Sequence, residues 1–367
     1  MTRYLLLLNG LAVLGAVVNH ASGWGFTSLM WWADRYAPVA APDFSQVGTP
    51  TYYVLRAMEQ LIMFSLPAFV FVSGYFVAVA AGRERVFGWD KVGARLKTLL
   101  IPYLLWSIAI FIGRFAEGAT DTSAGYARQL LFGRAAEPYY YIPLITQLFL
   151  LAPFLVAGMA ANWKVVLAAA AALQLGVQAA RYPVLLGLDM PLAAWIDRHA
   201  PGWFFPTLVF WFVFGTFVAY HVQEVTQWIS RWRRLLPWAT VCLGGFALLE
   251  WELVFRASGR QWLTPTPTVL DTFYALAFIL TFLAYAQKVP ARQSLDALGV
   301  RSFGIYLIHA PVLELLSRAS YHLAPTLLAH QLLLVALLVA AGVAVPMLLM
   351  QAVGRSPVRP YYNYLFG

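Results

Sequence analysis

The chain begins with an apolar run, YLLLLNGLAVLGAVVNH (residues 4–20), that ends in a histidine. No charged residue interrupts Tyr4 to Val18, and with the residues that follow the run is long enough to cross about 30 Å of hydrocarbon as a helix. An ionisable side chain inside or at the edge of a membrane is costly and rare. We therefore predict a membrane-spanning helix over 4–22, with His20 as the first candidate for chemistry.

The composition extends this prediction to the whole chain. Hydrophobic residues make up 61% of the sequence and charged residues 11%, whereas charged residues make up roughly 25% of a soluble domain. Stretches long enough to span a bilayer lie at 4–22, 60–81, 97–113, 142–160, 164–180, 203–221, 236–255, 268–287, 302–317 and 330–352. We expect an all-α, polytopic membrane helix bundle of about ten transmembrane helices, built as a single membrane-embedded domain over 1–367. Two stretches, 164–180 and 302–317, could instead be broken or re-entrant.

Positive charge is distributed unevenly between alternate connecting segments. Most of the 25 Lys and Arg residues fall in one set of short segments. The positive-inside rule makes this set cytoplasmic, so both termini are predicted to be cytoplasmic. The longer segments 22–59, 114–141 and 181–202 are predicted to face outside. This topology and anionic lipid account for the net charge of +9, so membrane lipid is an expected partner and nucleic acid is not.

Cysteine and histidine usage argues against metal and redox chemistry. Cys242 is the only cysteine, so no internal disulfide can form. No cluster of Cys and His has the spacing of metal ligands. The sequence therefore predicts no metal site and no permanently bound cofactor.

Four segments carry recognisable motifs. They are LNGL and VVNH within 4–20, FSLPAFVFVSGYF (64–76), KVGARLKTLLIPYLLW (91–106) and SFGIYLIHAP (302–311). In this order they resemble the acyltransferase-3 family of integral membrane acyltransferases, which act on cell-surface glycans. Each motif alone is short and apolar, but four in the family's order over most of the chain make the resemblance fairly specific.

One position departs from the family's pattern. The family's first helix usually carries an arginine eleven residues before its histidine, and here that position is Asn9. The only upstream arginine is Arg3, seventeen residues from His20, which is about 25 Å along a helix. Arg3 therefore cannot simply replace the family's arginine.

The resemblance implies a reaction and an orientation for it. An acyl group, acetyl or another short acyl, would pass from cytoplasmic acyl-CoA to a hydroxyl of an extracytoplasmic glycan, in the inner or plasma membrane. Such a transfer needs a base, and imidazole, with a pKa of about 6.5, is the usual choice near neutral pH. His20 is the predicted general base. The opposing interpretation is an interfacial histidine bonded to a backbone carbonyl.

Two further residues are candidates for the catalytic set. His309 is predicted to support the arm of the donor or to donate a hydrogen bond to the thioester carbonyl, and the alternative is a contact between helices. Glu59 is predicted to orient His20 or to bind the acceptor, and the alternative is an ion pair between helices.

A basic cluster precedes the third predicted helix. Arg83, Lys91, Arg95 and Lys97 are candidates for binding the phosphates of acyl-CoA. Arg95 and Lys97 match the family's motif, which is the stronger reason to choose them. The positive-inside rule alone would also explain the cluster.

Two other functions remain open from the sequence. Histidines and glutamates inside a membrane could form the polar pathway of a transporter or flippase of a lipid-linked sugar or acyl group. No symmetric pair of interrupted helices supports that alternative. A catalytically inactive scaffold is the third interpretation, and Asn9 keeps it open. The sequence does not indicate an oligomeric state.

Overall fold

The computed structural model describes residues 2–289 and 291–367, and within these ranges the chain is helical and has no β-strand. The long helices are α1 (Thr2–Phe26), α3 (Ser65–Ala81), α4 (Trp89–Ala116), α6 (Tyr141–Ala179), α11 (Leu236–Ser258), α12 (Val269–Tyr285), α14 (Ser302–Leu323) and α16 (Gln331–Arg355). The shorter helices are α2 (Pro50–Leu61), α5 (Ser123–Leu131), α7 (Arg181–Leu185), α8 (Pro191–His199), α9 (Val209–Tyr220), α10 (Val222–Trp232), α13 (Arg292–Val300), α15 (Pro325–Leu328) and α17 (Tyr362–Phe366). The predicted all-α class is confirmed.

Seven helical stretches of the described chain are long and apolar enough to cross a membrane. They are Arg3–Trp31, Pro50–Ala81, Trp89–Ala116, Glu137–Leu185, Leu236–Ser258, Val269–Lys288 and Gln331–Arg355. Each of the ten predicted stretches overlaps a helix, but not one for one. The predicted pair 142–160 and 164–180 lies in one stretch that is broken at Asn162, where φ is −155° and ψ is 86°. The number of crossings and the side of the termini stay predictions.

Two predicted spans fall outside the seven for different physical reasons. The stretch 203–221 contains only the 12-residue helix α9, because a 3₁₀ turn over Phe205–Thr207 precedes it. The stretch 302–317 forms the first part of the 22-residue α14, whose polar residues include Glu314 and Arg318 and dilute its apolar character.

The segments predicted to lie outside as loops contain helices. All of α2 except its last two residues lies within 22–59, α5 lies within 114–141, and both α7 and α8 lie within 181–202. The search for apolar runs overlooks α2 because its two charged residues, Arg56 and Glu59, lower its hydropathy. In the structure both are buried and pair with each other at 2.5 Å. Pairing makes burial of both charges tolerable, and hydropathy does not register it.

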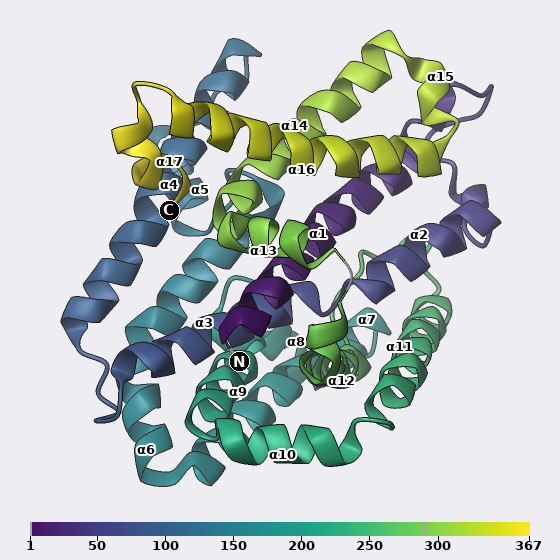
Figure 1. Cartoon of the computed structure of the whole chain (residues 1–367). Helices are drawn as coiled ribbons and strands as arrows, with labels where there is room; N and C mark the ends of the chain where they lie inside the picture. The colour runs from purple at the N-terminus through teal and green to yellow at the C-terminus, as the bar shows by residue number, and fades with distance from the viewer. Residues whose placement is uncertain (1, 290) are drawn as a thin grey trace.

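α1 occupies the centre of the bundle (Figure 1), where it packs against α3, α13, α14 and α16. Its side chains at Leu5, Leu8, Ala12 and Val17 are fully buried. A helix that is surrounded on several sides cannot rotate without disrupting all of its neighbours. The position of His20 is therefore fixed by the core.

α3 and α9 approach each other backbone to backbone. A Cβ atom added at Gly74 would overlap the carbonyl of Phe212, and one added at Gly215 would overlap the carbonyl of Phe71. Small residues permit this close packing between apolar helices. α3 therefore forms a rigid wall, which presents Phe69 and other residues to the cavities described below.

Candidate active site

His20 faces a carboxylate. Its side chain is 13% exposed, and its Nδ1 lies 3.7 Å from Oε2 of Glu137, whose own side chain is 86% exposed. Glu137 begins the 3₁₀ helix η4 (Glu137–Tyr140), which leads into α6. A carboxylate next to Nδ1 favours a proton on that nitrogen and leaves Nε2 free to act as a base.

His309 lies next to His20 in a different environment. The two ring centroids are 5.3 Å apart, and His309 is fully buried. Its Nδ1 lies 3.1 Å from the carbonyl oxygen of Ile305 in the same helix. A carbonyl only accepts, so Nδ1 carries the proton and Nε2 is an acceptor, which is buried without a hydrogen-bond partner among the described residues. This tautomer disfavours the predicted role of His309 as a donor to a thioester carbonyl.

A proline and two tyrosines hold η4 against α14. Pro311 has no N–H, so the carbonyl of Leu307 lacks its partner within the helix. The hydroxyl of Tyr139 donates to that carbonyl at 2.7 Å. The hydroxyl of Tyr306 in turn donates to the carbonyl of Pro138. These two bonds run in opposite directions between the same segments, and they fix Glu137 beside the two histidines.

Glu59 lies at the same level of the bundle as His20 and lines the same cavities. Its carboxylate accepts from Nη1 of Arg56 at 2.5 Å. No hydrogen bond or ion pair joins Glu59 to His20 among the described residues. The structure therefore places Glu59 in the wall of the site, and the carboxylate that lies next to the imidazole of His20 is that of Glu137.

Three cavities follow one another through the bundle. The inner chamber, of about 270 Å³, is lined by Asn9, Ser73, Arg95, Thr98 and Ser302 among others. The middle chamber, of about 200 Å³, is lined by Asn19, His20, Glu59, Trp211 and Asp271 among others. The outer chamber, of about 510 Å³, is lined by His20, Trp31, Trp32, Glu137 and Trp262 among others. The names follow the predicted orientation of the chain.

The chambers share walls. Phe69, Tyr141 and Tyr306 line both the inner and the middle chamber. Asn19 and His20 line both the middle and the outer chamber. Three aromatic rings thus stand between the first two chambers, and His20 stands at the boundary between the second two.

The four predicted phosphate-binding residues do not form one site. Arg95 lines the inner chamber. Lys91 donates through Nζ to the carbonyls of Ala80 and Val86, at 2.8 and 3.4 Å, and so caps the end of α3. Arg83 lines a separate surface hollow. Lys97 is exposed on α4 and lines none of these cavities.

The sequence did not single out Glu137 or the tyrosines of η4. The run Tyr139-Tyr140-Tyr141 resembles an interfacial aromatic belt, and Glu137 beside it resembles a surface carboxylate. A usable signal was Pro311, because a proline inside a helix frees a carbonyl that must find a donor elsewhere. Nothing in the sequence says that the donor is Tyr139.

Comparison with known proteins identifies the family. A family model described as an acyltransferase domain matches residues 3–351. No curated protein and no solved structure matches the chain. The matched range contains all four sequence motifs. It also contains every residue that lines the three chambers, apart from Gly367 in the inner chamber. The chain therefore belongs to the acyltransferase-3 family and is a multi-pass membrane acyltransferase.

Proposed function

We propose that the protein transfers a short acyl group from cytoplasmic acyl-CoA to a hydroxyl of an extracytoplasmic glycan or related surface molecule, in the cell (plasma) membrane. The observation that carries this proposal is the position of His20, which lines both the middle and the outer chamber. A base at that boundary can meet a donor that arrives from one side and an acceptor that arrives from the other.

The dimensions of the inner path support acyl-CoA as the donor. Asn9 lines the inner chamber and lies eleven residues before His20 on α1, which is about 16 Å along the helix. The pantetheine arm of CoA is as long as about four extended residues, or about 15 Å. An arm that enters beside Asn9 and Arg95 therefore reaches His20 with its thioester, once Phe69, Tyr141 and Tyr306 make room for it.

The chemistry follows from the two ring nitrogens of His20. Its Nε2 takes the proton of the acceptor hydroxyl while that oxygen bonds to the carbonyl carbon of the thioester. Glu137 stabilises the imidazolium that forms, as a carboxylate does in a catalytic triad. The tetrahedral intermediate then expels the thiolate of CoA, which recovers the proton from His20. The products are an O-acyl ester and free CoA, and no further reactant is needed.

Two neighbouring side chains support this step. Asn19 lines the same two chambers as His20, and its amide can donate to the oxyanion of the intermediate. His309 has a free acceptor at Nε2, which suits an N–H of the donor's arm. This assignment keeps the predicted support of the donor by His309 and drops the oxyanion role.

The outer chamber supports a sugar as the acceptor. Trp31, Trp32 and Trp262 line it beside His20 and Glu137. Aromatic faces pack well against the apolar faces of sugar rings, and carboxylates accept hydrogen bonds from sugar hydroxyls. The same carboxylates disfavour an acceptor that carries negative charge close to the reacting hydroxyl.

The test is transfer of label from radiolabelled acetyl-CoA and succinyl-CoA to surface glycans in membranes that contain the wild-type protein, His20→Ala or His322→Ala. His322 is exposed on the far part of α14 and serves as the matched control. We expect label with the wild type and with His322→Ala, and none with His20→Ala that is correctly inserted. Equal label in all three would refute His20 as the base, and transport without acylation would favour the transporter.

A further inference from the structure

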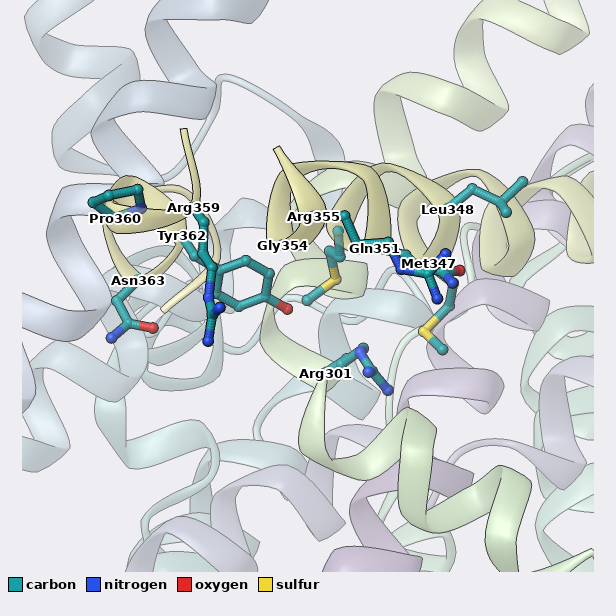
Figure 2. A pocket seen from close by; sticks show the side chains of 11 residues that line it. Arg301, Met347, Leu348, Gln351, Gly354, Arg355, Arg359, Pro360, Tyr362 and Asn363 are labelled. Carbon is teal, nitrogen blue, oxygen red and sulfur yellow. The ribbon is translucent and has the colours of Figure 1, made fainter. Parts of the chain in front are cut away.

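A hollow rich in arginine opens at the predicted cytoplasmic end of the bundle. Its volume is about 760 Å³, and its walls come from the start of α14, the end of α16 and the C-terminal segment with η7 (Arg359–Tyr361) and α17. Figure 2 shows Arg301 on one side of this hollow and Arg355 and Arg359 on the other. We call it the arginine groove. Three guanidinium groups from three segments thus surround one space.

In the described part of the chain, the arginines of the groove have no carboxylate partner. None of the three takes part in an ion pair within residues 2–289 and 291–367. With its amide oxygen turned toward Arg355, Gln351 accepts from that guanidinium at 2.9 and 3.2 Å, which orients it. Toward the described residues, the side chain of Arg301 donates one long bond of 3.4 Å, to the carbonyl of Ala297. Three cations held together repel one another, and an anion with several oxygens relieves this repulsion.

The groove adjoins the inner chamber. Arg301, in the groove, directly precedes Ser302 and Phe303, which line the inner chamber. α17 separates the two spaces, with Asn363 facing the groove and the chain end at Gly367 facing the chamber. The two spaces thus lie on either side of this short helix and share no lining residue, so a ligand that occupied both would have to pass a thin arm by α17.

We propose that the arginine groove binds the phosphates of the nucleotide head of the acyl donor. This inference rests on the proposed function, because it extends the same donor path outward. Along α14, Arg301 lies eight residues before His309, about 12 Å. That distance is shorter than the donor's arm of about 15 Å, so a head held at Arg301 delivers its thioester to the level of the two histidines. Phosphate groups match the planar, bidentate donors of arginine.

The groove accounts for the donor head better than the basic cluster before α4. In that cluster Lys91 is engaged with backbone carbonyls, and Arg83 lines a hollow that none of the other three predicted phosphate-binding residues lines. Arg95 in the inner chamber then meets the inner end of the donor's arm or its pyrophosphate. An anionic lipid headgroup carries the same phosphate chemistry, and the experiment must distinguish it from the nucleotide.

The test measures binding and not catalysis. Adenosine 3′,5′-bisphosphate contains the phosphorylated nucleoside of CoA and lacks the arm, so it reports on the groove even if the protein transfers no acyl group. Its binding and that of CoA are measured calorimetrically on protein in nanodiscs of phosphatidylcholine. The variants are Arg355→Gln, Arg359→Gln and the double variant, and the matched control is Arg83→Gln with Lys97→Gln. Arg355 and Arg359 are exposed, so these variants are expected to fold, which a thermal melt checks.

We expect each single variant to weaken binding of both probes about tenfold, the double variant to abolish it, and the control pair to leave it unchanged. Where transfer is measured, the groove variants raise the KM for acyl-CoA and keep kcat. Unchanged binding in the double variant, or loss in the control pair, overturns the proposal. If added phosphatidylglycerol displaces the nucleotide, the groove is a lipid site, and this result also overturns the proposal. If the nucleotide binds as expected but no acyl transfer occurs, the proposed function is refuted and the proposal for the groove stands.

Discussion

His20 and His309 are two imidazoles with ring centroids 5.3 Å apart, and their surroundings make them different groups. His20 is partly exposed and faces the carboxylate of Glu137. His309 is fully buried and faces a carbonyl of its own helix. A proton taken up by His20 gains a partner and a route to water, whereas a proton on Nε2 of His309 gains neither. The comparison teaches that depth and partner, rather than residue type, decide which of two neighbouring imidazoles is suited to act as a base.

The largest expected effect comes from replacing the exposed member of the pair. His20→Gln is expected to lower the rate of acyl transfer by roughly 10²–10⁴-fold, because general base catalysis contributes about that much. Single-turnover transfer from labelled acetyl-CoA in reconstituted vesicles measures this. The control is His199→Gln, since His199 is exposed on α8. A rate within twofold of the wild type would remove His20 from the mechanism.

The buried member should affect stability more than chemistry. His309→Ala removes a side chain that is fully buried, so we expect a loss of about 2–3 kcal/mol in the free energy of unfolding. Its rate of transfer should stay well above that of His20→Gln. Unfolding by denaturant in mixed micelles and the transfer assay together measure both quantities. A stable His309→Ala protein that is as inactive as His20→Gln would reverse the two roles.

The third prediction tests how the pair is held in place. Tyr139→Phe leaves the carbonyl of Leu307 without a donor and is expected to cost about 1–2 kcal/mol of stability. Pro311→Ala supplies the N–H that this carbonyl lacks. The double variant should therefore lose less stability than Tyr139→Phe alone, a coupling that a double-mutant cycle measures. Additive losses would show that Tyr139 does not replace the helical bond.

Much of the fold follows from the sequence because the bilayer constrains it. An apolar run such as 4–22 must be helical, since its backbone groups find no other partners in hydrocarbon. The exceptions share a cause. A search for apolar runs overlooks α2 because it counts the charges of Arg56 and Glu59 and does not register that they pair. Asn162 breaks α6 although the chain around it remains apolar. Pairing and single backbone torsions leave no mark on hydropathy.

The site was less accessible to sequence reasoning. His20 stood out because it is an ionisable residue in an apolar run. Its partner Glu137 lies more than a hundred residues away in the chain, at the start of a short 3₁₀ helix, and only the fold brings the two together. The arginine groove was not visible in the sequence for the same reason, since Arg301 and Arg359 come from segments that are distant in the chain. Convergence of this kind is a property of tertiary structure.

The smallest expected effect concerns the feature that most distinguishes the two histidines. Glu137→Gln keeps the shape of the side chain and removes its charge. Because the side chain of Glu137 is 86% exposed, its ion pair with His20 is worth at most about 1 kcal/mol. We expect kcat to fall about fivefold with an unchanged KM for acyl-CoA. The matched control is Glu224→Gln, since Glu224 lies 3.6 Å from His221 in a similar pair away from the chambers. If Glu137→Gln loses as much activity as His20→Gln, the carboxylate itself carries the proton and the two histidines differ less than their surroundings imply. If it loses none, partial exposure alone makes His20 the base.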